Sequence, residues 1–262
     1  MTVKEKYGFV PTSVLNLDSV PRKWRFVDDL LKIDLTRRSD NDIVLSGLKY
    51  SKFSYGVSDF VISYWTEKND LILDPFMGWG IRGAVAILED RRYIGYDISE
   101  TMFHKASDFL YSIPDLLNER KTPLLYKADG CLLEKISSDS IDFIFTCPPY
   151  YDREIYPDND EAQLSTLDNY DLFLESMLEH FENSYRVLKN GKFAAYVFGD
   201  WRHNGLMTFH MDMIERAREV GYEVWDIIIL VLNSPFTFWK CGANDRMKYT
   251  SKSHEYLVVF KK

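Results

Sequence analysis

The chain has 262 residues, of which 46% are hydrophobic and 27% are charged, and its formal net charge is −8 at pH 7. This length can bury one sizeable core, and the proportions are those of a globular protein, so a disordered or fibrous chain is excluded. No apolar run reaches the length of a membrane span, and neither the three cysteines nor the five histidines show metal-site spacing, so neither a membrane anchor nor a metal site is expected.

Short apolar runs alternate with helical patterns in the first half of the chain, which is typical of a wound parallel sheet. The stretch "DLILDPF" predicts a strand ending near Asp74. A helix follows over "GIRGAVAILED", with Ile81, Val85 and Leu88 on one face. A second strand is then predicted at "YIGYDIS", a helix over "ETMFHKASDFLYSI", and a short third strand at "LLYKADG".

The second half continues the alternation. "SIDFIFTCPPY" is a continuous apolar run, typical of a strand buried on both faces. A helix is predicted over about 168–188, a strand at "KFAAYVFGD" and a helix over "LMTFHMDMIERAREVG". We expect Trp201, Arg202 and His203 to cap this last helix rather than to contact a ligand.

The end of the chain breaks the pattern. "YEVWDIIILVL" and "EYLVVFKK" predict two strands joined by a long loop without a helix, so they should pair antiparallel near the sheet edge. The prediction is an α/β fold with a seven-stranded, mostly parallel sheet, one antiparallel strand in the edge region, and helices on both faces. Residues 1–50 are expected to form an N-terminal extension, and residues 51–262 the α/β domain.

Ligands of such sheets gather at the carboxyl ends of the strands. Gly78 and Gly80, after the first strand, allow a ligand to approach the backbone, although neither a GxGxxG fingerprint nor a Walker A loop is present. Asp97 and Asp129 end the next two strands, where carboxylates can reach ribose hydroxyls and an adenine amino group. Each feature alone also fits a simple turn or cap, but their succession favours a nucleoside site.

The fourth strand ends at "TCPPYY". Because proline lacks an N–H group and disfavours helix in the preceding residue, Cys147 and Pro148 should be extended and should direct fixed carbonyl acceptors into the pocket. Tyr150 would then offer a flat face to a base. In isolation, a stretch that merely ends the strand is an equally good interpretation.

These motifs resemble those of the DNA amino-methyltransferases, whose cofactor motif appears as "DPFMGWG" and whose catalytic [DNS]PPY motif appears as "CPPY". The resemblance runs from about Lys52 to Lys262 and is strongest to stand-alone enzymes of phages and mobile elements. It implies a Rossmann-like class I methyltransferase that methylates N6 of adenine or N4 of cytosine with S-adenosylmethionine, after flipping the base out of duplex DNA.

The resemblance also implies site residues. Those implied for catalysis are Cys147, Pro148, Pro149 and Tyr150. Those implied for binding the cofactor are Phe53, Asp74, Pro75, Phe76, Gly78, Gly80, Asp97, Ile98, Asp129 and Gly130. Those implied for binding the DNA substrate are Tyr151, Arg153, Trp239, Lys240 and Arg246. No metal ligand is implied.

Cys147 departs from the family pattern, because Asp, Asn or Ser is usual there and a thiol is a weak acceptor. Its near-isostery with serine slightly favours cytosine, but adenine stays open. A cytosine carbon-5 methylase is rejected, because Pro-Cys with a downstream Glu-Asn-Val is absent. An RNA or protein-amide methyltransferase, and a catalytically silent cofactor- and DNA-binding subunit, remain alternatives.

Charge is unevenly distributed along the chain. Acidic residues dominate 151–183, whereas basic residues dominate 233–262 and the N-terminal segment through Arg38. These basic segments, including the N-terminal extension of residues 1–50 ahead of the catalytic domain at 51–262, are candidates for contacting double-stranded DNA. From charge alone, ordinary solvated surfaces are an equally good interpretation. We expect a cytoplasmic, bacterial or phage-encoded enzyme. A homodimer is compatible with the sequence, which does not decide whether a restriction nuclease accompanies it.

Overall fold

The computed structural model describes residues 12–15, 53–117, 122–151, 164–167, 169–202, 205–232, 248, 250 and 252–262. Its strands are β1 (Val14–Leu15), β2 (Leu71–Asp74), β3 (Arg92–Asp97), β4 (Leu124–Lys127), β5 (Ile141–Thr146), β6 (Leu188–Phe198), β7 (Trp201–Arg202), β8 (Leu206–Met207), β9 (Glu223–Val231) and β10 (His254–Lys261). Its helices are α3 (Tyr55–Trp65), α4 (Ile81–Leu88), α5 (Glu100–Leu117), α6 (Tyr170–Val187) and α7 (Phe209–Val220), with a short 3-10 helix at Leu164–Thr166.

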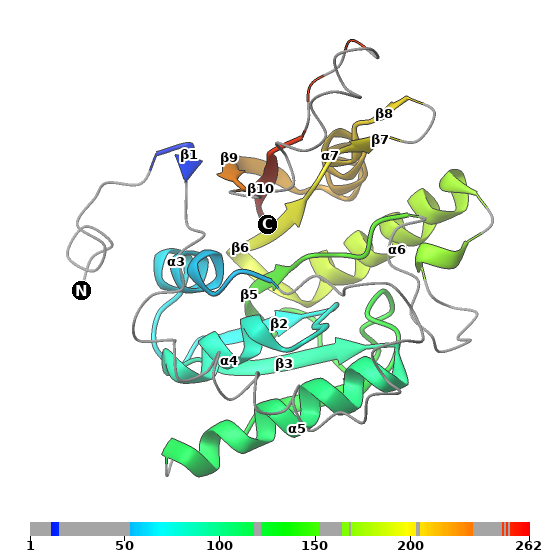
Figure 1. Cartoon of the computed structure of the whole chain (residues 1–262). Helices are drawn as coiled ribbons and strands as arrows, with labels where there is room; N and C mark the ends of the chain where they lie inside the picture. Colours follow the sequence, from blue (N-terminus) through cyan, green and yellow to red (C-terminus); the bar gives the residue numbers. More distant parts are fainter. Residues whose placement is uncertain are drawn as a thin grey trace, which may run out of the picture.

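One sheet of eight strands runs through the molecule in the order β1-β9-β10-β6-β5-β2-β3-β4 (Figure 1). Strands β2 to β6 are parallel to their neighbours within this group, whereas β10 is antiparallel to both β6 and β9. This confirms the predicted mostly parallel sheet with one reversed strand. The eighth strand was not predicted, because β1 has only two residues and therefore shows no alternation of apolar and polar side chains.

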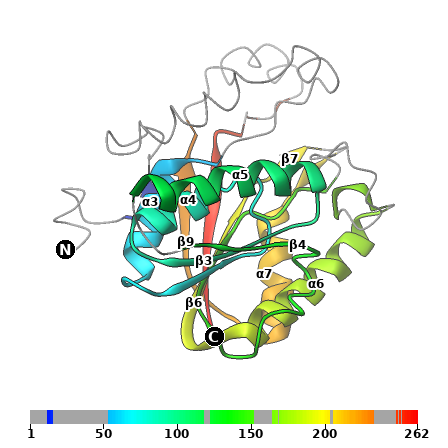
Figure 2. The same cartoon turned by 90° about the horizontal axis from the view of Figure 1, so that it is seen from below.

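Helices cover both faces of the sheet, which confirms that part of the prediction. On one face, α3, α4 and α5 pack against Phe143, Phe145 and Val197. On the other, α6 and α7 pack against Ile144 and Tyr196. Figure 2 shows the two groups of helices on opposite sides of the strands. Each face of β5 is therefore buried, as its uninterrupted apolar run requires.

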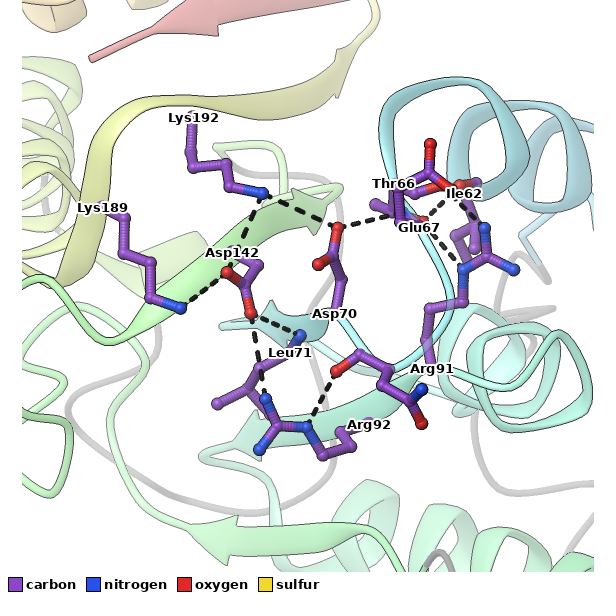
Figure 3. Close-up of polar contacts among 11 residues, drawn as sticks. Ile62, Thr66, Glu67, Asp70, Leu71, Arg91, Arg92, Asp142, Lys189 and Lys192 are labelled. Atoms are coloured by element: carbon purple, nitrogen blue, oxygen red, sulfur yellow. Dashed lines mark hydrogen bonds and ion pairs between the residues drawn. The ribbon is translucent and has the colours of Figure 1, made fainter.

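A polar network ties together the amino ends of the strands (Figure 3). Asp142 of β5 accepts hydrogen bonds from Lys189 Nζ at 2.6 Å and from the Leu71 amide at 2.9 Å. Although burial opposes its ionisation, these donors lower the pKa of Asp142. The side chains at the amino ends of the strands are therefore engaged in structural contacts. The carboxyl ends of β2, β3, β4 and β5 lie together on the opposite side of the sheet.

The predicted capping role of Trp201 and Arg202 is wrong. Both residues form β7, which pairs antiparallel with β8, and α7 begins only after Thr208. The Trp201 side chain is buried in the core and packs edge-on against Phe209, the first residue of α7, but it makes no capping hydrogen bond there, and His203 lies outside the described residues. None of the helices in the described part of the chain is long and apolar enough to cross a membrane.

Candidate active site

The turn after β2 is built by two glycines in left-handed conformations. Gly78 has φ +52° and Gly80, which precedes α4, has φ +77°, values that side-chain-bearing residues rarely adopt. The Met77 amide donates to the Tyr96 carbonyl at 2.9 Å, which fixes the turn against β3. The backbone therefore makes a tight turn at the carboxyl end of β2, and neither glycine places a side chain there.

Asp97 ends β3 directly beside this turn. Its Oδ2 accepts a hydrogen bond from the Gly78 amide and its Oδ1 from the Ser99 amide, both at 2.9 Å. Burial raises the pKa of the Asp97 carboxyl to about 7, even though these two amides favour its ionised form. Each oxygen can accept a further bond, so the carboxylate can bind two neighbouring hydroxyl groups. Ile98, next in the chain, is partly exposed at the same edge.

The loop after β4 lies against the turn after β2. A Cβ atom added to Gly130 would stand 1.9 Å from the Pro75 carbonyl oxygen, so only glycine permits this close approach. Asp129 Oδ1 accepts from the Cys131 amide at 2.8 Å and thereby closes its own small turn. The predicted nucleoside-binding residues of three successive strands thus come together at one edge.

His180 was missed by the sequence prediction. It is fully buried on α6, with its Nδ1 3.1 Å from the Gly130 carbonyl, its Nε2 2.9 Å from the Tyr196 hydroxyl, and its ring 5.0 Å from that of Phe76. Burial lowers its pKa to about 4, so the imidazole is neutral at physiological pH. The His180 side chain thus contacts both the turn after β2, through Phe76, and the loop after β4, through Gly130. The available signal was a histidine on the apolar stripe of its helix.

The Asp74 side chain points into the protein interior. The side chain is fully buried, and its two oxygens accept hydrogen bonds from the Arg82 guanidinium, Tyr93 Oη and Thr146 Oγ1. The Phe76 amide also donates to Oδ1. Both oxygens are thus occupied by protein donors, so the side chain anchors the turn, and a contact between Asp74 and the cofactor stays a prediction.

The "CPPY" segment follows β5 at the same edge. Cys147 is half-buried and not disulfide-bonded, Pro148 is buried, and Pro149 and Tyr150 are partly exposed. The Thr146 hydroxyl, one residue earlier, bonds to Asp74 Oδ1 at 2.8 Å, which places the segment beside the turn after β2. The two halves of the predicted site therefore adjoin.

The Tyr150 ring is held in a defined orientation. It stacks on Trp201 with ring centroids 5.7 Å apart and an interplanar angle of 17°, and it meets Phe209 edge-on at 5.5 Å. Its hydroxyl lies 3.4 Å from Glu255 Oε1 of β10. Tyr150 thus belongs to an aromatic stack whose other members come from β7 and α7.

Two other predicted residues have partners within the fold. Tyr151 packs its ring against Tyr170 and Phe173 of α6, so it faces the helix layer. Phe53 meets Phe145 edge-on at 5.6 Å and lies under the Arg82 guanidinium, 4.7 Å from ring centroid to Cζ. The remaining predicted substrate-binding residues, Arg153, Trp239, Lys240 and Arg246, lie outside the described residues.

The residues at this edge fit S-adenosylmethionine. The glycine turn leaves backbone amides at the start of α4, Asp97 can accept two vicinal hydroxyls, and Gly130 keeps the loop opposite Pro75 close. These are the features that a nucleoside with a charged tail requires at the carboxyl edge of a parallel sheet. When bound, this cofactor supplies an electrophilic methyl group on a sulfonium centre.

Comparison with solved structures supports the fold. A putative methyltransferase from Bacillus halodurans matches with a TM-score of 0.54 and 12% identity over 79% of this chain and 98% of that one. A SAM-dependent methyltransferase from Methanosarcina mazei matches with a TM-score of 0.52 and 13% identity over 77% and 96%. At these identities the likeness extends to the Rossmann-like methyltransferase fold.

Sequence comparison identifies the family. The orphan methyltransferase M.BamHII of Bacillus amyloliquefaciens is 43% identical over 42 residues, 16% of each chain. The type II methyltransferase M2.MboI of Moraxella bovis is 43% identical over 68 residues, 25% of this chain and 24% of that one. The chain thus matches a quarter or less of either relative's length. A family model described as DNA methylase matches residues 48–108 and 141–262, well over half of the chain. The chain belongs to the DNA methylase family.

Proposed function

We propose that this protein transfers a methyl group from S-adenosylmethionine to the exocyclic amino group of adenine (N6) or cytosine (N4) in DNA. The observation that carries the proposal is the contact between two strand ends. Thr146, directly before the "CPPY" segment, bonds to Asp74 below the glycine turn. This bond supports the proposal because it joins the segment that would supply acceptors for an amine to the residues that would hold the methyl donor.

The chemistry requires little of the protein beyond positioning. The lone pair of an exocyclic amine is delocalised into the base, so the amine is a poor nucleophile. A carbonyl acceptor at Pro148 and the Cys147 sulfur hold its hydrogens and favour a tetrahedral nitrogen as positive charge develops. The nitrogen lone pair forms the new N–C bond, the sulfonium S–C bond breaks with its electron pair passing to sulfur, and the extra proton leaves the nitrogen for water.

Tyr150 positions the base. The target amine is paired inside a duplex, so the base must leave the helix to react, and an aromatic face compensates for the lost stacking. Trp201 and Phe209 hold the Tyr150 ring in place before the base arrives. This preorganisation lowers the entropy lost on forming the reactive geometry. We assign Cys147, Pro148 and Tyr150 to the base, and Asp97, Gly78, Gly80, Gly130 and Phe76 to the cofactor.

A direct test uses purified protein, tritiated S-adenosylmethionine and unmethylated duplex DNA. Tyr150→Ala should lower transfer about 5- to 150-fold, because stacking on an aromatic side chain contributes roughly 1–3 kcal/mol per base. Its affinity for S-adenosylmethionine should stay unchanged. Tyr185→Ala is the matched control, because this tyrosine also packs edge-on against another ring, Tyr222, but lies near the opposite, amino edge.

The same assay separates the alternatives. Label appearing in RNA or protein but not in DNA would replace the proposed substrate. Binding of S-adenosylmethionine without transfer to any of the three would indicate a catalytically silent subunit. Full transfer by Tyr150→Ala would remove the stacking role. Residues 1–50 and the basic segment from 233 onward remain our candidates for the DNA-binding surface.

A further inference from the structure

A buried ion pair that the proposed chemistry does not use lies beneath the site. Arg82, in the first turn of α4, is 5% exposed, and Asp74, the last residue of β2, is fully buried. Two nitrogens of the guanidinium donate to the two carboxylate oxygens, Nε to Oδ2 at 2.7 Å and Nη2 to Oδ1 at 3.2 Å. Although burial disfavours the charged form, Asp74 raises the pKa of Arg82 above its ordinary value.

Arg82 also reaches the segments on either side. Its Nη2 donates to the Phe76 carbonyl at 2.6 Å, within the turn predicted to bind the cofactor. Its Cζ lies 4.7 Å from the centroid of the Phe53 ring, a cation–π arrangement. One planar guanidinium therefore fixes the turn from below and holds the segment that precedes α3.

Asp74 extends this network to the strand that carries the "CPPY" segment. Backbone pairing between β2 and β5 includes Ile72 with Phe143 and Leu73 with Ile144, and it ends before Thr146. Beyond that point the Thr146 hydroxyl donates to Asp74 Oδ1 at 2.8 Å. A side-chain hydrogen bond thus continues the connection between the two strands up to the residue next to Cys147.

Stability alone is a weak reason for such a network. Apolar residues of similar volume can replace a buried ion pair without loss of folding, because desolvation offsets the attraction between the charges. They cannot replace a bidentate link of fixed geometry between the end of β2 and the start of α4. The Arg82–Asp74–Thr146 network contains such a bidentate link. It contacts the turn after β2 at Phe76 and the residue before Cys147, and in the proposed reaction the distance between these two segments is the distance over which the methyl group moves.

We propose that Arg82, Asp74 and Thr146 form a positioning relay that holds the Cys147–Pro148 acceptors in register with the cofactor turn. These three residues act through others and touch neither substrate nor methyl group. The inference rests on the proposed methyl transfer. It assigns to Arg82, Asp74 and Thr146 an effect on the rate of that reaction that acts through the residues they position.

The test compares two substitutions that each remove one hydroxyl donor from the same carboxylate. Thr146→Val removes the bond from β5, and Tyr93→Phe removes the bond at 2.9 Å from β3, outside the relay. Both should lower Tm by about 2–4 °C. Only Thr146→Val should slow single-turnover methyl transfer, on the order of 100-fold, with the Kd for S-adenosylmethionine within about twofold of wild type. Thr146→Ser, which keeps the hydroxyl, should restore the rate.

A second readout does not depend on activity. Alkylation of Cys147 by iodoacetamide, followed by peptide mass spectrometry, reports how freely its segment opens. We expect alkylation on the order of ten times faster in Thr146→Val than in Tyr93→Phe. If wild type transfers no methyl group, the proposed function fails while this comparison still tests the relay. Equal alkylation rates in the two variants, or equal transfer rates where transfer occurs, would overturn the relay.

Two buried arginines provide a further control. Arg91 is 6% exposed and donates to Thr66 Oγ1 at 2.9 Å, in the network at the amino edge (Figure 3). Arg82→Met and Arg91→Met should both lower Tm, but only Arg82→Met should also slow methyl transfer. A rate in folded Arg82→Met equal to that of Arg91→Met would count against the relay. If Arg82→Met does not fold, the Thr146 and Tyr93 pair decides.

Discussion

The carboxyl of Asp97 should make cofactor binding depend on pH. Its pKa is raised from 3.8 to about 7 by burial. Only the ionised form can accept two ribose hydroxyls through oxygens that already bind the amides of Gly78 and Ser99. If the protonated form does not bind, the apparent Kd for S-adenosylmethionine rises about 11-fold at pH 6 and about twofold at pH 7, relative to its value at high pH.

The assay is isothermal titration calorimetry from pH 5.5 to 8.5 with wild type and Asp97→Asn. The variant should bind weakly and without this pH dependence, and any ionisation of the ligand itself appears equally in both proteins. His180 does not interfere, because its pKa of about 4 keeps it neutral throughout. A Kd for wild type that is flat over this range, or one that changes equally in Asp97→Asn, would refute the reasoning.

The raised pKa of Asp97 should make folding stability depend on pH in the opposite direction to cofactor binding. Because the folded protein holds the Asp97 proton more tightly than the unfolded chain, the contribution of this carboxyl to the free energy of unfolding decreases as the pH rises from about 4 to about 7. Cofactor affinity increases over the same range. Denaturant unfolding of wild type and Asp97→Asn at pH 5 and pH 7.5 measures the difference. A wild-type stability that rises between these values relative to the variant would contradict the raised pKa.

Three further substitutions test individual contacts. Gly130→Ala should cost roughly 1–3 kcal/mol of stability by chemical denaturation and weaken cofactor binding, because its Cβ would stand 1.9 Å from the backbone oxygen of Pro75; unchanged stability would disprove the close approach. Cys147→Ser should keep or raise turnover, since a hydroxyl accepts hydrogen bonds better than a thiol; complete loss would indicate chemistry specific to sulfur. Gly199→Ala should slow methyl transfer, because its Cβ would stand 2.9 Å from the Tyr150 hydroxyl and would shift the ring that Trp201 and Phe209 hold in place; unchanged transfer would show that the ring position is not limiting.

The fold was largely predictable because its signals are local. Glycine turns and the apolar run of β5 mark strand ends, and a parallel sheet brings those ends to one edge. The position of Gly78, Asp97 and Gly130 near one another follows from that rule alone. Strand β1 could not be predicted, because two residues carry no pattern and their pairing with Ile229 and Leu230 depends on contacts remote in sequence.

The contacts that orient the site residues were less predictable. From sequence, Asp74 looks like a strand-end carboxylate similar to Asp97. Only its contacts with Arg82, eight residues later, and with Tyr93 and Thr146 show that its carboxylate is buried and hydrogen-bonded within the protein. Trp201 was predicted to cap a helix, whereas it stacks on Tyr150 from a β7–β8 pair that is too short to leave a sequence pattern. Sequence patterns locate such side chains along the chain, whereas their partners are set by packing.

The central claim is methyl transfer to an exocyclic amine of DNA. Nucleoside mass spectrometry of DNA from host cells that lack their own methylation tests it most directly, with wild type or Tyr150→Ala expressed to equal soluble levels. The account predicts an N6-methyladenine or N4-methylcytosine peak with wild type and, at expression low enough to leave sites unmethylated, a peak about 5- to 150-fold smaller with the variant. DNA without either modified base, in cells that contain folded wild-type protein, would contradict it.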